Sequence, residues 1–353
     1  MQKKTLVITG GLGYIGSHTC LELLNDFNLV VIDNLSNASI SVIDDMKKIN
    51  KNITADNFTF YMIDLLDQQS LDNVFKKYTP YAVIHFAGYK SVSESIKNPG
   101  LYYNNNITAT LTLLGVMEKY ECHNLIFSSS ATVYGRQVSP INEKASVGMG
   151  ITNPYGKTKY MLESILQDFC TANKNLRVIA LRYFNPIGAH SSGIIGENPN
   201  DIPNNLMPII LKVAINNNTT YYFGKKYDAL PILGSDYETR DGTCERDFIH
   251  VVDLARAHVC AIKNIDSLTG FNVFNVGTGK PTSVLELVDT FKKVNKVALP
   301  YVMRNKRAGD IGSCYCDPSY IKSILKWKPE YSIEEMCRDA WNYQISKMKE
   351  IVR

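Results

Sequence analysis

The sequence predicts an α/β protein with a doubly wound parallel sheet, followed by a smaller lobe of mixed α/β structure. Short β-branched and aromatic runs alternate with helical patterns in the first half of the chain. Strands buried on both faces have this continuous apolar character, and alternation with helices is typical of a parallel sheet. The expected strands are 5–9, 29–32, 58–61, 82–86, 125–127 and 178–181, with a helix at 15–24.

The chain changes character beyond Asn185, where prolines and asparagines become frequent and the apolar runs shorten. We therefore expect a first domain at 1–185 and a second lobe at 186–353, with the segment 240–275 packing back on the first domain. Ligands of open α/β sheets bind outside the carboxyl ends of the strands. The second lobe is expected to close over that edge.

Composition narrows the class of protein. The 353 residues carry 38 basic and 34 acidic side chains, a net charge of +4, and the basic residues are scattered. A nucleic-acid surface needs a denser patch, and no apolar run approaches the ~18 residues of a membrane span. The eight cysteines form no CxxC pair, so we expect free thiols and no metal site. With no leader pattern, the prediction is a cytoplasmic protein without nucleic-acid or membrane partners.

A glycine-rich loop joins the first expected strand to the first expected helix. Gly11, Gly13 and Gly16 fit the spacing G-x-G-x-x-G, and Gly10, Gly13 and Gly16 fit the variant with one more residue between the first two. Glycine allows a tight turn and a close approach to a pyrophosphate, and the helix N-terminus offers free N–H groups to the anion. The loop predicts a dinucleotide site in a Rossmann domain; the alternative is a plain tight turn.

An acid at the end of the second strand indicates which dinucleotide. Asp33 follows Gly13 by twenty residues, and no Arg or Lys occurs within 34–41. A carboxylate there accepts hydrogen bonds from the adenosine ribose hydroxyls and repels a 2′-phosphate. NAD is therefore the expected cofactor, rather than NADP.

Tyr155 and Lys159 are spaced to lie on one face of a helix that begins after Pro154. Tyrosine, with a pKa near ~10, is a weak base at neutral pH. A neighbouring ammonium and a positively charged nicotinamide both favour the tyrosinate form, so Lys159 and the cofactor are expected to lower the pKa of Tyr155. Ser130, just past an expected strand, can share a proton between Tyr155 and a substrate alcohol. The alternative is a chance coincidence at an exposed helix start.

Together these motifs resemble the extended short-chain dehydrogenase/reductase superfamily, and within it the UDP-glucose 4-epimerase family. The similarity extends from Leu6 to about Trp327. The matching stretches are Gly10-x-x-Gly13-x-x-Gly16, Ser17-His18-Thr19, His85 to Lys90, Ser128 to Gly135, Tyr155-x-x-x-Lys159, Leu181 to Pro186, Asn204 to Pro208 and Arg246 to Val251.

The resemblance implies a set of contacts for tightly bound NAD that is not consumed. Residues 33–37 would hold the adenosine ribose, Asp64 and Leu65 would border the adenine, and Lys159 would hold the nicotinamide ribose. The full implied set is Gly10, Gly13, Tyr14, Ile15, Gly16, Asp33, Asn34, Leu35, Ser36, Asn37, Asp64, Leu65, Phe86, Ala87, Gly88, Lys90, Asn105, Ser128, Tyr155, Lys159 and Tyr183.

The second lobe would bind a UDP-sugar, with arginine forks suited to a diphosphate. The implied contacts are Lys90, Ser130, Ala131, Thr132, Tyr155, Phe184, Asn185, Asn205, Leu206, Arg246, Arg307, Asp310 and Cys314. From the residues alone, Arg246 beside Asp247 reads as a local ion pair, and Arg307 as part of a surface run.

The implied reaction interconverts UDP-galactose and UDP-glucose through a transient 4-keto sugar, with Tyr155, Lys159 and Ser130 as the catalytic set. Ala131 and Thr132 replace the Asp-Glu pair that dehydratases of this superfamily place there, which disfavours dehydration. The alternatives are another nucleotide-sugar 4-epimerase, such as one acting on UDP-glucuronate, or a non-catalytic NAD-sensing protein.

Two departures from the family pattern bear on the substrate. Residues 225–233 look like an insertion of about nine residues in a surface loop, which chains tolerate well. Cys314 stands where some members have a bulky tyrosine, so UDP-GalNAc and UDP-GlcNAc are a second expected pair; the alternative is an ordinary small buried thiol. A homodimer through the helix at 108–120 and the helix that begins at Tyr155 is expected by resemblance.

Overall fold

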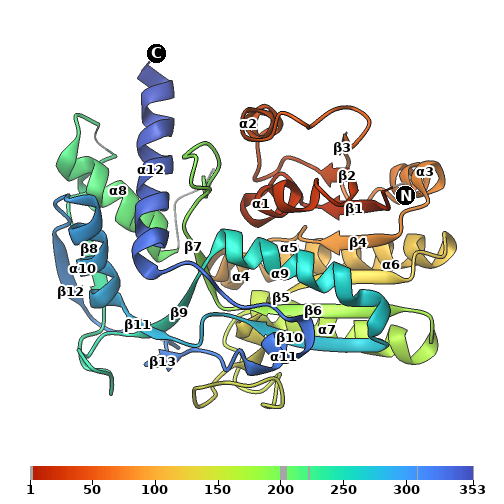
Figure 1. Ribbon diagram of the computed structural model, residues 1–353. Coiled ribbons are helices and arrows are strands. Elements are labelled where there is room, and N and C mark those ends of the chain that lie inside the picture. Colours follow the sequence, from red (N-terminus) through yellow and green to blue (C-terminus); the bar gives the residue numbers. More distant parts are fainter. Residues whose placement is uncertain (1–2, 199–204, 222, 308, 353) are drawn as a thin grey trace.

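The first lobe is built on a seven-stranded parallel sheet with the strand order β10-β6-β5-β4-β1-β2-β3 (Figure 1). The structure is a computed structural model that describes residues 3–198, 205–221, 223–307 and 309–352. The strands are β1 (Thr5–Thr9), β2 (Asn28–Asp33), β3 (Phe58–Met62), β4 (Ala82–His85), β5 (Asn124–Ser130), β6 (Arg177–Tyr183) and β10 (Gly270–Val276). The predicted doubly wound parallel sheet is confirmed.

Alternate strand residues fill a separate core on each face of the sheet. In β1, Leu6 and Ile8 belong to one core and Val7 belongs to the other, as the two-residue period of a strand requires. The first core is covered by α1 (Tyr14–Leu23), α2 (Ser41–Ile49), α9 (Val251–Asn264) and α11 (Ser319–Leu325), and the second by α3 (Gln68–Tyr78), α6 (Ala109–Lys119) and α7 (Pro154–Ala172).

Part of the chain beyond residue 185 returns to this sheet. Strand β10 pairs with β6 in parallel register, with Val276 beside Tyr183, and α9 packs against α1. Helix α11 also joins the first core through Ile321 and Leu325. The first lobe therefore takes α9, β10 and α11 from the second half of the sequence.

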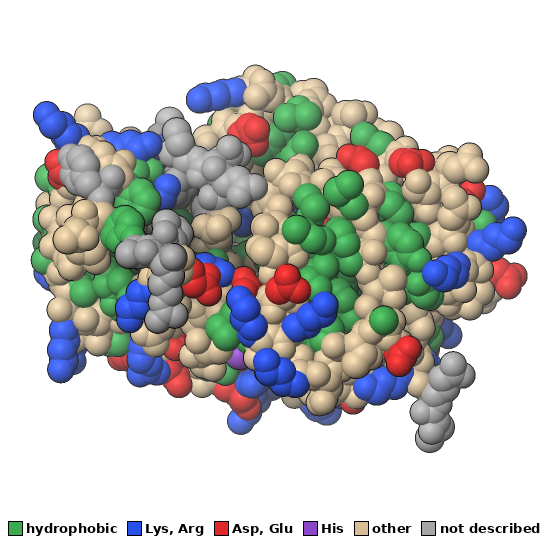
Figure 2. Space-filling model, turned by 90° about the horizontal axis from the view of Figure 1, so that it is seen from above, with side chains coloured by type: hydrophobic (Ala, Val, Ile, Leu, Met, Phe, Trp, Pro, Cys, Tyr) green, Lys and Arg blue, Asp and Glu red, His purple; other side chains and the backbone are tan. Residues whose placement is uncertain are grey.

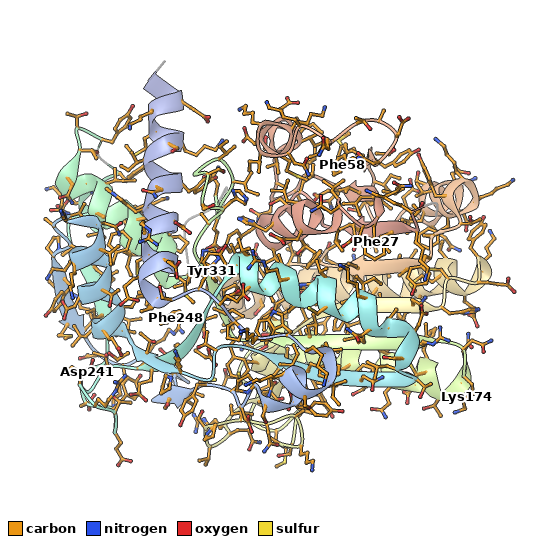
Figure 3. The ribbon with its side chains drawn as sticks, viewed as in Figure 1. Phe27, Phe58, Lys174, Asp241, Phe248 and Tyr331 are labelled. Atoms are coloured by element: carbon orange, nitrogen blue, oxygen red, sulfur yellow. The ribbon has the colours of Figure 1, made fainter. Side chains whose placement is uncertain are left out.

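In its described residues, the second lobe contains two small sheets and three α-helices, with α12 rising along it in Figure 1. Phe248 lies beside the lower end of α12 in Figure 3 and shares a core with Met336 and Ala340 of that helix. The elements are β7 (Asn185–Ile187), β9 (Glu245–His250), β11 (Pro281–Ser283), β13 (Ser313–Cys314), β8 (Leu230–Leu233), β12 (Tyr301–Arg304), α8 (Leu206–Asn218), α10 (Val284–Asn295) and α12 (Ile333–Val352).

The surface-loop interpretation of 225–233 is wrong. The segment forms a short 3-10 turn (Lys225–Tyr227) and then β8, which pairs in parallel with β12. Leu230 and Ile232 point into the core of the second lobe together with Tyr227. Pro231 fits because β8 belongs to a two-stranded sheet, where an edge strand tolerates a missing N–H.

The surface, the helices and the cysteines of the described residues can be compared with what composition predicts. On the face shown in Figure 2, Lys and Arg side chains are spread among acidic and polar ones. None of the helices in the described part of the chain has the length and apolar character needed to cross a membrane. Within the same residues, no cluster of three His, Cys, Asp or Glu side chains is suited to a metal ion, and the eight cysteines are free.

The alternation along β8 predicts unequal costs for two leucine truncations. Leu230 is 0% exposed and Leu233 is 38% exposed. Leu230→Ala should lower the free energy of unfolding by about 2–5 kcal/mol, because it leaves a cavity in a packed core. Leu233→Ala, three residues along the same strand, should change it by less than about 0.5 kcal/mol. Urea denaturation measures both, and equal effects would contradict the burial of β8.

Candidate active site

The predicted site residues of the first lobe meet at the carboxyl edge of the parallel sheet. The glycine loop follows β1, Phe86 follows β4, and Ser130 ends β5 directly opposite Tyr183 of β6. Parallel strands present all their carboxyl ends at one edge. The edge therefore brings together residues that lie far apart in the sequence.

Of the four glycines in the loop, packing restricts Gly10, Gly11 and Gly16 but not Gly13; a Cβ on Gly11 would lie 2.8 Å from Val31 Cγ1. A Cβ on Gly10, whose φ is +67°, would lie 2.6 Å from Ala87 N, and a Cβ on Gly16 would lie 2.4 Å from Gly10 O. A Cβ on Gly13 would meet only Gly10 O, at 3.4 Å. Gly13 caps the N-terminus of α1, so the space above it suits a ligand phosphate approaching the backbone. The loop fits a dinucleotide pyrophosphate.

Asp33 lies beside this loop at the end of β2. Its Oδ2 accepts a hydrogen bond from Leu12 N over 3.1 Å and its Oδ1 accepts one from Leu35 N over 2.9 Å. The side chain is 9% exposed; burial raises the pKa of the carboxyl, and these two bonds oppose the rise. A carboxylate held in this way can accept further bonds from ribose hydroxyls.

The expected adenosine contacts lie together. Asn34 Nδ2 donates to Asp64 Oδ2 over 2.9 Å, which joins the ends of β2 and β3. Ser36 N donates to Asn34 Oδ1, and Leu66 N donates to Asp64 Oδ1. Local side-chain caps of this kind hold the two turns in fixed conformations.

The segment after β4 lies against the glycine loop, because Phe86 N and Ala87 N both donate to Thr9 O. The side chain that fixes this segment is Asn106, which donates to Tyr89 O and accepts from Tyr89 N. The predicted residue, Asn105, donates to Asn106 Oδ1 over 3.1 Å. Both asparagines lie in a π-helical turn (Tyr103–Thr108), a feature frequent at functional sites.

Lys159 projects from the first turns of α7 toward β5. Asn153 caps this helix by accepting from Gly156 N, and Pro154 occupies its first position. Lys159 Nζ donates to Ser128 O over 2.6 Å and lies 4.9 Å from the centre of the Phe127 ring. Burial lowers the pKa of Lys159 to about 8.

The expected effect of Lys159 on Tyr155 is wrong for this arrangement. Burial raises the pKa of Tyr155, and the group that opposes the rise is the Ser130 hydroxyl, through a hydrogen bond. Ser130 Oγ accepts from Thr132 N over 3.2 Å and from Thr132 Oγ1 over 2.9 Å. Because Thr132 donates to Ser130, the Ser130 hydrogen is directed to Tyr155. The ammonium of Lys159 is instead bonded to the Ser128 carbonyl.

Tyr183 makes a contact that sequence reasoning missed. Its hydroxyl lies 2.5 Å from His258 Nε2 on α9, and His258 Nδ1 lies 2.9 Å from Leu254 O. A carbonyl only accepts, so Nδ1 carries the hydrogen and Nε2 accepts from Tyr183. Burial lowers the pKa of His258 to about 4 and raises the pKa of Tyr183. The Phe86 ring lies 4.7 Å from the His258 ring.

Glu197 is a second missed residue, and it links the predicted contacts of the two lobes. Its Oε1 accepts from Lys90 Nζ over 3.1 Å and from Asn205 Nδ2 over 3.4 Å. Asn205 is the N-cap of α8 and Leu206 begins that helix. Phe184 is buried at the end of β6 and donates its N–H to Val276 O; Asn185 begins β7.

Among the described residues, Arg246 does not form the local ion pair with Asp247 that the sequence alone suggests. Its Nη1 donates to Glu245 O and Ile311 O, and it lies opposite Cys314 on β13. The Asp247 carboxylate is fully buried and accepts instead from the backbone N–H groups of 278, 279 and 316. Cys314 is partly buried, and its pKa is raised by burial.

Arg307 and Asp310 form an ion pair in the loop before β13, with Arg307 Nη2 2.7 Å from Asp310 Oδ1. The Arg307 side chain is exposed, as the surface interpretation expects. The pair nevertheless fixes Arg307 to the loop that leads to Cys314.

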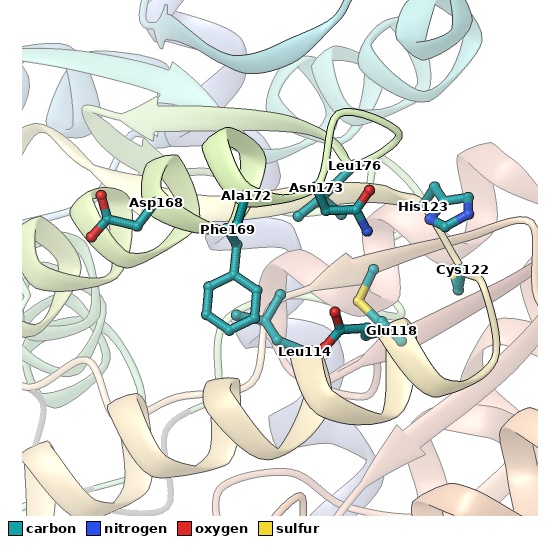
Figure 4. A pocket seen from close by; sticks show the side chains of 10 residues that line it. Leu114, Glu118, Cys122, His123, Asp168, Phe169, Ala172, Asn173 and Leu176 are labelled. Atoms are coloured by element: carbon teal, nitrogen blue, oxygen red, sulfur yellow. The ribbon is translucent and has the colours of Figure 1, made fainter.

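A cavity of about 340 Å³ lies away from this site (Figure 4). It opens between the C-terminal ends of α6 and α7, next to the start of β5, whereas Tyr155 is at the other end of α7. It is therefore at the amino edge of the sheet, where α/β folds do not bind their substrates. Its lining is Leu114, Met117, Glu118, Cys122, His123, Asp168, Phe169, Ala172, Asn173 and Leu176.

The fold and site define a Rossmann protein of dehydrogenase type with a tyrosine–lysine–serine centre. The model of the NAD dependent epimerase/dehydratase family matches residues 6–277, and the chain belongs to this family. It is 49% identical to the UDP-glucose 4-epimerase of Bacillus subtilis (strain 168) over 345 residues, 97% of each chain. It is 45% identical to that of Homo sapiens over 349 residues, 98% of this chain and 97% of the relative.

Solved structures that are similar to this chain carry the same enzyme name as its sequence relatives. The crystal structure of UDP-glucose-4-epimerase from Stenotrophomonas maltophila, with bound NAD and formylated UDP-arabinopyranose, has a TM-score of 0.92, 38% identity, and coverage of 98% and 99%. The enzyme from Bifidobacterium longum, in complex with NAD+ and UDP, has a TM-score of 0.90, 41% identity, and coverage of 98% and 99%. The predicted family is confirmed.

The packing of the glycine loop predicts that one substitution weakens NAD binding and another weakens folding. Gly13→Ala should fold, because its methyl group would have only a 3.4 Å neighbour, but NAD retention should fall, since the methyl occupies the approach of the pyrophosphate. Gly16→Ala should lower the melting temperature, because its Cβ would lie 2.4 Å from a carbonyl oxygen. Thermal unfolding and NAD content per purified chain measure both; full NAD content in Gly13→Ala would contradict the placement.

Proposed function

We propose that this chain interconverts UDP-galactose and UDP-glucose through a transient 4-keto sugar, with NAD bound throughout. The observation that carries the proposal is the centre at the sheet edge, where Ser130 is bonded to Tyr155 and Lys159 lies one turn beyond it. The glycine loop and Asp33 lie at the same edge. Relatives with this activity at 45–49% identity over nearly the whole chain support it.

Tyr155 is the proposed base for the 4-hydroxyl of the sugar. NAD, when bound, supplies a hydride acceptor that later returns the hydride to the sugar. Ser130 donates to the Tyr155 oxygen and so stabilises the tyrosinate form against burial. Proton movement between Tyr155 and the sugar hydroxyl is therefore possible in both directions. Lys159, fixed to the Ser128 carbonyl, is proposed to hold the nicotinamide ribose.

An epimerase must hold the nucleotide firmly while the keto sugar turns over. We assign that anchoring to Arg246, Asn205 and Leu206, with Arg307 and Asp310 at the rim. Guanidinium groups recognise diphosphates by bidentate hydrogen bonds. Arg246 is suited to this because two backbone carbonyls fix its Nη1 and no ion pair among the described residues engages it.

Thr132 supports epimerisation over dehydration. Dehydration needs an acid–base pair next to the catalytic hydroxyl, and this chain has Ala131 and Thr132 there. The Thr132 hydroxyl donates to Ser130, which gives it a positioning role. A non-catalytic NAD-sensing protein would have no need of the bonded Tyr155–Ser130 pair.

We extend the proposal to the organisation of the chain. Residues 1–185, with the returning segment at 240–275, would hold NAD, and 186–353 would bind the UDP-sugar. The α6 and α7 helices would form a homodimer contact, which their exposed apolar side chains Leu111 and Met161 favour. A cytoplasmic location is proposed with it, since free cysteines suit a reducing compartment.

Tyr155→Phe tests the base. The variant keeps the ring and loses the proton acceptor, so conversion of UDP-galactose should fall by about 10²–10⁴-fold. Coupled detection of UDP-glucose, without added NAD, measures the rate. Tyr160→Phe, five residues further along α7, is the matched control and should stay near the wild-type rate. A Tyr155→Phe rate close to wild type would remove the proposed mechanism.

Cys314 carries the proposal that N-acetylated sugars are also accepted. Its side chain is small and lies beside Arg246. Wild-type protein should interconvert UDP-GalNAc and UDP-GlcNAc, and Cys314→Tyr should abolish that conversion while UDP-galactose conversion persists, because the ring fills the space of the N-acetyl group. Chromatographic separation of the four nucleotide sugars measures this. Lack of UDP-GalNAc turnover in the wild type refutes the idea.

A further inference from the structure

A buried ion pair fastens α7 to the sheet. Glu163 lies one turn beyond Lys159 on α7, and its carboxylate pairs with Arg182 of β6. Arg182 Nε donates to Glu163 Oε1 over 2.9 Å and Arg182 Nη2 donates to Oε2 over 2.5 Å, so the pair is bidentate. Both side chains are 5% exposed. Charges at this depth are stable only when they are paired and hydrogen-bonded.

The pair is also bonded to the strand that carries the catalytic serine. Ser129 Oγ donates to Glu163 Oε1 over 2.5 Å. Its neighbour on one side, Ser128, accepts from Lys159 through its carbonyl. Its neighbour on the other side, Ser130, is bonded to Tyr155. Glu163, Lys159 and Tyr155 of α7 therefore all contact the same three-residue stretch of β5.

The opposite side of Arg182 extends the network. Its guanidinium carbon lies 4.7 Å from the centre of the Tyr134 ring, a cation–π distance. The Tyr134 hydroxyl donates to Asn275 Oδ1 of β10 over 2.7 Å. The ion pair thus connects α7 to β5, β6 and β10.

We propose that Glu163 and Arg182 are positioning residues of the catalytic centre: the pair holds α7 against β5 and places the Glu163 carboxylate one helical turn from Lys159. Residues four apart on a helix lie on the same face, so Glu163 is the acid next to Lys159 along α7. The inference rests on the proposed function.

The charged groups around Lys159 determine whether its pKa rises or falls. Burial lowers the pKa of Lys159 to about 8, and Glu163 opposes that fall. His85, on β4, is neutral because burial lowers its pKa to about 3. The titratable and charged groups on the packed elements are His85 on β4, Arg182 and Tyr183 on β6, Tyr134 after β5, His258 on α9, and Tyr155 and Glu163 on α7.

Glu163→Gln tests the inference, since it keeps the shape and removes the charge. Lys159 then loses its ammonium at lower pH, and the alkaline limb of UDP-galactose conversion should move down by at least about one pH unit. The amount of NAD that stays bound per chain after desalting should also begin to fall at a lower pH than in the wild type. Asp168→Asn, an exposed acid further along α7, is the matched control and should leave both profiles unchanged.

A second variant tests the inference if Glu163→Gln does not fold. Glu163→Gln combined with Arg182→Met removes both charges and leaves no lone buried cation; it should show the same downward shift. A folded Glu163→Gln or double variant with the wild-type limb, or with an equal loss at every pH, overturns the inference. A wild type that fails to convert UDP-galactose refutes the proposed function instead, and the NAD-retention profiles still decide the inference.

Discussion

The junction between the end of β5 and helix α7 is the contact on which the site depends. Three consecutive serines, 128–130, meet Lys159, Glu163 and Tyr155 through a carbonyl and two hydroxyls. The parallel pairing of β5 with its neighbours fixes the strand, and the apolar side chains under α7 fix the helix. Hydrogen bonds between two elements that are already rigid place atoms more precisely than contacts from loops would.

The first lobe could be predicted closely from the sequence because its strands are buried on both faces. Such strands have unbroken apolar runs, and the six expected ones all occur as β1 to β6. The second lobe carries a weaker signal. Strand β8 differs from the loop that the sequence predicts, because it is short, contains Pro231 and pairs with a strand that begins at Tyr301. Periodicity within a window says nothing of a partner seventy residues away.

The residues of the site also fall into two groups, those that the sequence predicts and those that it does not. Residues with motif spacing could be found, and the structure places the glycine loop, Asp33, Ser130, Tyr155 and Lys159 at one edge. Their partners could not be found, because each meets its residue across a long separation, 75 positions for His258 and 107 for Glu197. The electrostatic expectation for Lys159 failed because spacing on a helix gives proximity but not the direction of a hydrogen bond. That direction depends on a carbonyl supplied by another strand.

The return of the chain to the first sheet has a mechanical consequence. The polypeptide leaves this sheet after β6 and comes back for α9, β10 and α11, so it passes between the lobes repeatedly. Several parallel connections resist rotation far better than a single hinge. A fragment ending at residue 185 would also expose the edge of β6 and the face of α1 that α9 covers. The two lobes are therefore joined at several points along the chain and not through one linker.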